Sequence, residues 1–119
     1  MNIYKQIEAE IQAASHIVIT AHKSADGDSI GSSLGLLYFI EKLGKKVVVC
    51  HPDKAPDFLD WLDTSLIILM DENPEEVTSE MQKADLIFCL DYNATNRVGP
   101  EMQVLLEEAT CKKIMIDHH

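Results

Sequence analysis

The chain has 119 residues, and 46% of them are hydrophobic, a proportion typical of one soluble globular domain. Its formal net charge of -10, from 20 acidic against 10 basic residues, argues against a long nucleic acid lying across this domain, because nucleic-acid footprints are normally basic. No window approaches the roughly 18 consecutive apolar residues of a membrane span, and the N-terminus lacks the pattern of a signal peptide. We therefore expect a cytoplasmic protein that does not bind membranes.

The three cysteines are interpreted as buried, reduced thiols, because they are odd in number and none lies in a Cys-x-x-Cys pair. The acidic balance does not exclude a small phosphorylated substrate. Two bound divalent cations would change the charge from -10 to -6 and would reverse the local field so that it attracts phosphate.

Apolar residues at helical spacing alternate along the chain with short β-branched runs. In chain order we expect a helix over Ile3–Ala14, a strand over His16–Thr20, a helix over Ser29–Leu43, a strand over Lys46–Cys50, a short helix over Pro56–Leu62, an apolar run of undecided type over Leu66–Met70, a helix over Pro74–Ala84, a strand over Asp85–Leu90, a helix over Pro100–Ala109 and a strand over Lys113–Ile116. This alternation predicts an α/β fold, with a doubly wound, mostly parallel sheet and helices on both faces.

Three of these predictions concern side-chain environment. The continuous apolar run before Cys50 predicts a fully buried strand. The small residues Gly31, Ser32, Ser33 and Gly35 would let their helix lie close to the sheet. His16 opens a strand. His51 follows another strand and could approach the edge of the sheet where the strands end, but it is interpreted as a surface-loop residue because no carboxylate pair accompanies it.

Polar clusters follow three of the predicted strands. They are His22 with Asp26 and Asp28 after the first strand, Asp91 after the strand that ends at Leu90, and Asp117 with His118 and His119 after the last strand. Parallel strands place their carboxyl ends at one edge of the sheet, where doubly wound folds bind ligands. The topology therefore predicts that the three clusters meet.

The crowding of these groups favours a metal site. Four carboxylates brought together repel one another unless a cation neutralises them, and together with three histidines they exceed the ligands of one catalytic metal. Two divalent ions are the economical interpretation, and Mn²⁺ suits a mixture of oxygen and nitrogen ligands, with Mg²⁺, Fe²⁺ or Zn²⁺ as alternatives. Two-metal sites commonly activate water for phosphoester hydrolysis.

Each cluster alone has an ordinary structural explanation. Asp26-Gly27-Asp28 is typical of a turn, Asp91 could cap a helix, and the terminal Asp-His-His could be a surface cluster. Their coincidence at three strand ends favours the functional interpretation.

The motifs resemble those of a known family, the DHH phosphoesterases. His22-Lys-Ser-Ala-Asp26-Gly27-Asp28 is similar to the family's first motif, Asp91 to its second, and Asp117-His118-His119 to the motif that names it. Within the family, the run HKSADGDSIGSSLGL and the segment from Asp91 through Arg97 to Gly99 most resemble the branch of nanoRNases and pAp phosphatases. That branch degrades very short oligoribonucleotides and removes the 3'-phosphate of 3'-phosphoadenosine 5'-phosphate (pAp).

The resemblance implies a role for each site residue. His22 and Asp26 would hold one metal, Asp28 and His118 the other, and Asp91 would bridge them. His119 would contact the substrate phosphate, Asp117 would orient His118, and Arg97 would form either a structural ion pair or a phosphate contact.

The resemblance also implies where this chain departs from the family. Residues 1–119 would form the N-terminal catalytic domain without the family's fourth aspartate and C-terminal substrate-binding domain, so that the isolated chain would be inactive or weak. Manganese-dependent pyrophosphatases of the superfamily typically have Asp-Thr-Asp where this chain has Asp26-Gly27-Asp28. Alternatives are such a pyrophosphatase and a non-catalytic metal- or nucleotide-binding module, and homodimer assembly stays open.

Overall fold

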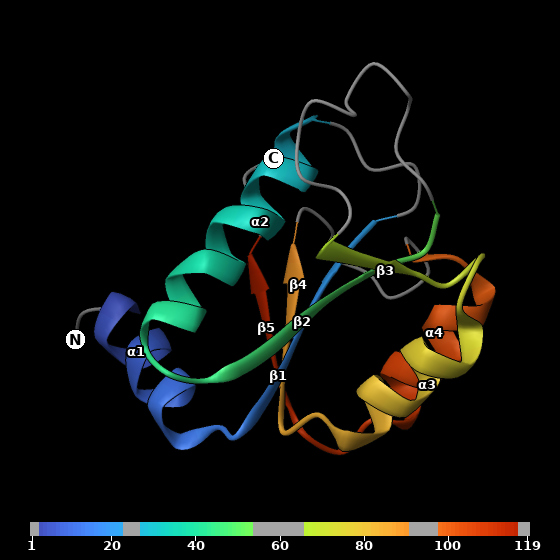
Figure 1. The fold of residues 1–119 in the computed structure, drawn as a ribbon. Helices are drawn as coiled ribbons and strands as arrows, with labels where there is room; N and C mark the ends of the chain where they lie inside the picture. Colours follow the sequence, from blue (N-terminus) through green and yellow to red (C-terminus); the bar gives the residue numbers. More distant parts are fainter. Residues whose placement is uncertain (1–2, 23–26, 54–65, 91–97, 117–119) are drawn as a thin grey trace.

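The structure, a computed structural model, describes residues 3–22, 27–53, 66–90 and 98–116. In chain order the elements are α1 (Ile3–Ala13), β1 (His16–Ala21), α2 (Gly27–Lys42), β2 (Lys46–His51), β3 (Ile67–Leu69), α3 (Pro74–Lys83), β4 (Leu86–Leu90), α4 (Pro100–Glu108) and β5 (Lys112–Ile116). The five strands form one sheet in the order β3-β2-β1-β4-β5, and every pairing is parallel (Figure 1). The predicted fold class is confirmed.

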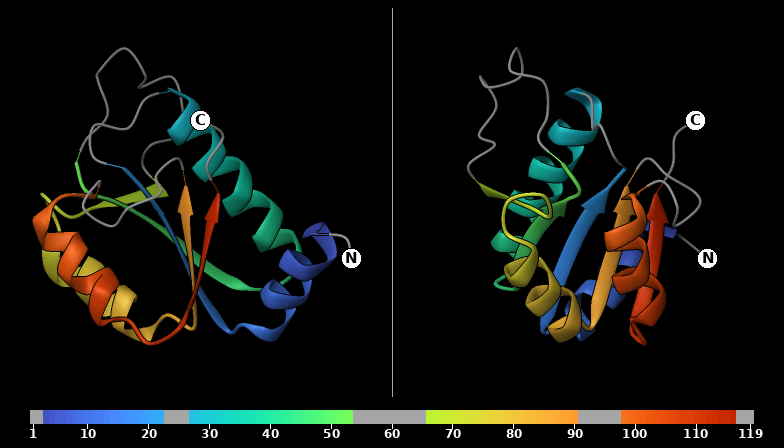
Figure 2. Two further views of the ribbon diagram at one scale, coloured as in Figure 1. Left: turned by 180° about the vertical axis from the view of Figure 1, so that it is seen from behind. Right: turned by 90° about the vertical axis from the view of Figure 1, so that its right-hand side faces the viewer.

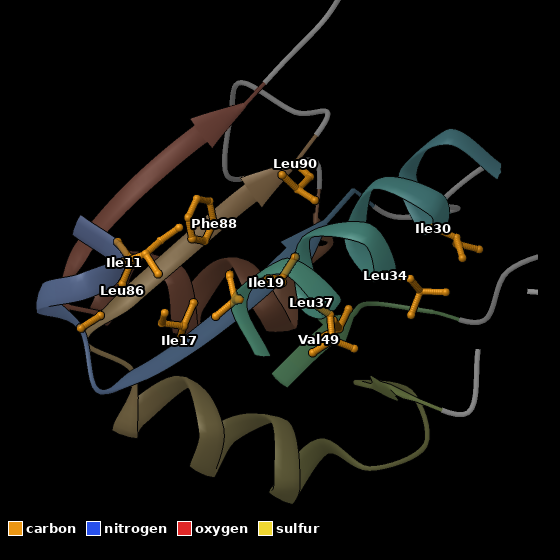
Figure 3. Packing of buried hydrophobic residues seen from close by; sticks show 12 residues of the cluster. Ile11, Ile17, Ile19, Ile30, Leu34, Leu37, Val49, Leu86, Phe88 and Leu90 are labelled. Atoms are coloured by element: carbon orange, nitrogen blue, oxygen red, sulfur yellow. The ribbon is translucent and has the colours of Figure 1, made fainter. Parts of the chain in front are cut away.

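Helices cover both faces of this sheet, with α1 and α2 on one side and α3 and α4 on the other (Figures 1 and 2). Alternation along the strands explains why both faces are apolar. Ile17 and Ile19 of β1 pack with α1 and α2, whereas Val18 between them packs with α3 and α4. Figure 3 shows the first of these two cores, with Phe88 of β4 fully buried at its centre.

The strand order reverses between β1 and β4. The chain proceeds from β1 to β2 and β3 on one side, and then returns to place β4 and β5 on the other side of β1. In doubly wound sheets such a reversal opens a crevice outside the carboxyl ends of the two central strands. A ligand site is therefore expected at the carboxyl ends of β1 and β4.

The opposite, amino end of these two strands is fixed by one carboxylate. Asp85 accepts hydrogen bonds from the backbone N–H groups of Ser15 (2.7 Å) and His16 (2.9 Å), and its own N–H donates to the carbonyl oxygen of His16 (2.9 Å). Burial alone would raise the pKa of Asp85, but these hydrogen bonds stabilise the charged form, and the pKa is lowered. The register of β1 against β4 is thereby set from its first residue.

The structure assigns the undecided run near β2 and corrects the predicted burial of β2. The undecided run at Leu66–Met70 contains β3, a short edge strand that pairs only with the last three residues of β2. β2 is buried only over Val49 to His51, and the predicted full burial is wrong for its first half, which does not pair with β3. The predicted helix over Pro56–Leu62 lies outside the described residues.

The α2 helix also differs from the prediction. It begins at Gly27, two residues before the predicted start, and it ends at Lys42. Gly44, which follows shortly after, has a positive φ of 78°, as is common just beyond helix C-termini. Three of its four small residues do not face the sheet. Gly31, Ser32 and Gly35 are exposed, and no heavy atom lies within 4 Å of a Cβ built on Gly31 or Gly35, whereas Ser33 is buried.

The cysteine prediction is confirmed in part. All three thiols are free, Cys50 and Cys89 are buried, and Cys111 is half-buried because it lies between α4 and β5. Burial, followed by the charges of Glu80 and Glu76, raises the pKa of Cys50 to about 12. Within the described part of the chain, no helix is long and apolar enough to cross a membrane.

Candidate metal centre at the carboxyl edge of the sheet

The register of the sheet brings three strand ends to the same level. Ala21, the last residue of β1, pairs with Leu90, the last residue of β4, and Leu90 pairs in turn with Ile116, the last residue of β5. Neighbouring strands lie about 4.8 Å apart. The three strands that precede the predicted ligand clusters therefore end side by side, at the reversal of strand order.

His22 is the predicted metal ligand whose side chain the structure describes. It directly follows β1 and is half-buried at the carboxyl edge. Asp28 belongs to the first turn of α2, which begins at Gly27, so the backbone that carries this second predicted ligand is part of a helix. Both positions agree with the predicted edge.

The remaining predicted site residues lie outside the described part of the chain: Asp26, Asp91, Arg97, Asp117, His118 and His119. Among the described residues no group of three or more His, Cys, Asp or Glu side chains gathers as a metal site. The ligand set as a whole stays a prediction.

A buried polar pair that the sequence interpretation missed lies beneath this edge. His51 is the last residue of β2 and is 1% exposed, so its interpretation as a surface-loop residue is wrong. Its Nε2 atom forms a hydrogen bond of 3.0 Å with the hydroxyl oxygen of Ser33 on α2, which is fully buried. The direction of this bond depends on the tautomer of His51.

The protonation of His51 is coupled to the candidate site. Burial, and then the nearby charge of His22, lowers the pKa of His51 to about 4, so its imidazole is neutral at pH 7. Two sequence signals could have revealed the pair. His51 comes two residues after the core residue Val49, and Ser33 comes three residues after the core residue Ile30, so each shares the buried face of its element.

A second hydrogen bond holds β1 against β4 close to the same edge. The hydroxyl of Thr20 donates to the carbonyl oxygen of Phe88 at 2.9 Å, and Thr20 is fully buried. Together with the contacts of Asp85 at the amino end, this bond fixes the strand pair at both ends.

A small cavity of about 110 Å³ lies between the ends of β2 and β3 and the start of α4. It is lined by Pro52, Met70, Val98, Gly99, Pro100, Glu101 and Met102. Among the described lining residues most are apolar, one is a carboxylate and none is cationic, whereas phosphate sites usually contain cationic side chains.

Comparison with known proteins gives a consistent result. Residues 16–119 match the DHH family, N-terminal domain. A bifunctional oligoribonuclease and PAP phosphatase, NrnA of Mycoplasma pneumoniae, is 32% identical over 111 residues, which cover 92% of this chain and 32% of that protein. The crystal structure of an exopolyphosphatase-related protein from Bacteroides fragilis superposes with a TM-score of 0.91 and 41% sequence identity, over 97% of this chain and 34% of that one.

The present chain thus spans about a third of the length of each of these two proteins. The family match covers all five strands, and it includes the three predicted ligand clusters. With its parallel sheet, its level strand ends and this match over residues 16–119, the chain belongs to the DHH family.

Proposed function

We propose that this chain forms the metal-binding part of a two-metal-dependent phosphoesterase that hydrolyses very short oligoribonucleotides, pAp, or both. The observation that carries the proposal is the register of Ala21, Leu90 and Ile116, because the chain leaves all three strands at one level. The next residues in the sequence are His22, Asp91 and Asp117, and consecutive Cα atoms are 3.8 Å apart. Membership of the DHH family supports the same site.

The proposed ligands are His22 and Asp26 for one ion, Asp28 and His118 for the other, and Asp91 as the bridge between them. Aspartate oxygens and imidazole nitrogens fit two Mn²⁺ ions, and Mg²⁺ or another divalent ion would be accepted by the same donors. When bound, such ions supply an activated water and neutralise charge on the phosphoryl oxygens.

The remaining proposed site residues act on the substrate or on the ligands. His119 contacts the phosphate that is removed, and Asp117 accepts a hydrogen bond that orients His118. Arg97 either forms a structural ion pair or binds the phosphate in a bidentate manner. The start of α2, where backbone N–H groups lack partners within the helix, adds positive potential beside Asp28 and the phosphate.

The proposed substrate follows from the similarity to the protein from Mycoplasma pneumoniae rather than from the geometry of the strand ends. The protein from Mycoplasma pneumoniae carries the name of an oligoribonuclease and PAP phosphatase, and the net charge of -10 supports a small phosphorylated ligand rather than a long polyanion. We propose the cytoplasm, where such nucleotides occur, as the site of action.

A second candidate is hydrolysis of a phosphoanhydride bond. The similar solved structure from Bacteroides fragilis is described as exopolyphosphatase-related. The same metal site would bind a phosphoanhydride, since both reactions place a phosphoryl group between an activated water and a leaving oxygen.

The test is a side-by-side assay of the natural protein that contains these residues, with Mn²⁺, on pAp, a diribonucleotide, pyrophosphate and polyphosphate. We expect release of phosphate from pAp and of mononucleotide from the diribonucleotide, and loss of both in Asp91→Asn. Turnover of pyrophosphate or polyphosphate alone would replace the first candidate by the second. Mn²⁺ binding without turnover of any of the four would indicate a non-catalytic binding module.

A further inference from the structure

The hydrogen bond between Ser33 and His51 is a directional link between α2 and β2. Both residues are at most 1% exposed, and their neighbours on this side of the sheet are the apolar residues Ile30, Leu34 and Leu37. Apolar contacts are non-directional, whereas a buried hydrogen bond is lost when its partners shift. The pair therefore fixes how far along the sheet α2 can lie.

Two small residues near the start of α2 do not help to fix its position against the sheet. Gly31 and Gly35 are exposed and would have no heavy atom within 4 Å of an added Cβ. Ser33 is five residues after Asp28, or about 8 Å along a helix that rises 1.5 Å per residue. A shift of α2 at Ser33 would move the backbone of Asp28 by a similar amount.

His51, the other partner of this bond, lies near the predicted ligand His22. His51 ends β2, and β2 pairs with β1, which His22 directly follows. The charge of His22 contributes to the low pKa of His51, so the two imidazoles lie within electrostatic range. At pH 7 the neutral ring of His51 adds no positive charge that would repel a divalent cation nearby.

We propose that Ser33 and His51 are positioning residues for the metal centre: their hydrogen bond holds the start of α2, with Asp28, at a fixed distance from the ends of β1 and β2, with His22. This inference rests on the proposed function and assigns a role to two residues that touch neither metal nor substrate.

The test measures Mn²⁺ affinity of the 119-residue chain by calorimetry and by electron paramagnetic resonance of free Mn²⁺. We expect Ser33→Ala to weaken binding about tenfold, the low end of the roughly 10–100-fold range for groups behind metal ligands. His51→Leu should also weaken binding, and the double variant should weaken it by less than the two single effects combined, because the bond between Ser33 and His51 is lost in all three. His51→Gln, which retains a polar atom at the position of Nε2, should restore affinity to within about twofold.

The matched control is at the other end of the same sheet. His16 forms a buried side-chain contact of 2.6 Å with Glu80, so His16→Leu removes a comparable pair beside the amino end of β1. It should lower stability and leave Mn²⁺ affinity unchanged. An equal loss of affinity in His16→Leu, or no rescue by His51→Gln, would show a merely structural role and overturn the proposal.

Ser33→Ala removes only a hydroxyl, so it keeps the test decisive if His51→Leu does not fold. Wild-type affinity in Ser33→Ala would refute the positioning role while leaving the metal centre intact. Absence of Mn²⁺ binding by the wild-type chain would instead refute the proposed function, and the positioning role with it.

Discussion

Protonation of His51 should make the fold sensitive to mildly acidic pH. The pKa of His51 is lowered by burial, and secondarily by the charge of His22, from 6.5 to about 4. The unfolded chain therefore binds a proton on His51 at a higher pH than the folded chain does. The stability that depends on a neutral His51 is fully present above pH 6.5, and it is lost as the pH falls from 6.5 towards 4.

The size of this loss of stability follows from the difference between the pKa values of His51 in the unfolded and folded chain. At 1.36 kcal/mol per pH unit, lowering the pKa from 6.5 to about 4 corresponds to a loss of about 3 kcal/mol once the pH is well below 4, and of about 2 kcal/mol between pH 7 and pH 5. For a domain whose total stability is about 5–15 kcal/mol, such a loss is readily measured.

The assay compares the wild type with His51→Gln, which retains a hydrogen-bonding partner for Ser33 but does not titrate. Urea unfolding of both proteins at pH 7, 6 and 5 in metal-free buffer gives the free energy of unfolding. The wild type should lose about 2 kcal/mol more than the variant between pH 7 and pH 5. Parallel pH profiles for the two proteins would refute the inference that His51 is buried and neutral.

Three further predictions concern the scaffold. Phe88→Ala should reduce the free energy of unfolding by about 3–5 kcal/mol, because Phe88 is fully buried, whereas Phe39→Ala, at a residue that is 50% exposed, should change it by less than about 1 kcal/mol in the same urea titration. Asp85→Ala should lower the free energy of unfolding by about 1 kcal/mol at pH 7, a small loss because solvent screens this exposed carboxylate. The difference in stability between wild type and variant should shrink as the pH falls below about 3.8, because the carboxylate then loses its charge. A thiol reagent at pH 8 should modify Cys111 before Cys50, because Cys50 is buried and its pKa of about 12 keeps it protonated. Mass spectrometry would follow the modification of each cysteine in the folded and in the urea-unfolded chain. Equal rates for Cys50 and Cys111 in the folded chain would show that Cys50 is accessible.

Local pattern was sufficient to predict most of the fold. The run Ile17 to Ile19 and the run Leu86 to Leu90 are apolar at every position, and both became strands buried on two faces. A continuous apolar run wrongly predicted full burial for Lys46 to Val48. Burial of a strand depends on its neighbour, and β3 pairs only with the residues that follow Val48. Strand length at the sheet edge is a property of the assembled sheet that no single run reveals.

The environment of individual polar residues was harder to predict. Gly31 and Gly35 appeared suited to close packing, but the apolar residues Leu34 and Leu37 determine which side of α2 faces the sheet, and the glycines lie on the opposite side. His51 was interpreted from the lack of an accompanying carboxylate pair rather than from its alternation with Val49. Its partner, Ser33, is 18 residues away in the sequence, so the bond becomes visible only when α2 and β2 are in contact.

The candidate site was predicted from three clusters that follow parallel strands, and the roles of its residues from the family resemblance. The structure supports the part of that argument that concerns the backbone. Ala21, Leu90 and Ile116 end at one level, and His22 follows the first of them at the expected edge. The anchoring of this register by Asp85, whose partners Ser15 and His16 are far from it in the sequence, became visible only in the folded chain.

The most direct measurement of the central claim is a Mn²⁺ titration of the wild-type chain beside one variant from each strand end: His22→Ala, Asp91→Asn and His118→Ala. A single centre shared by three strand ends predicts that each substitution weakens Mn²⁺ binding at least tenfold, with the bridging position, Asp91→Asn, affecting every ion bound. Wild-type binding in all three variants, or loss of only one independent ion in each, would contradict a shared metal centre at this edge of the sheet.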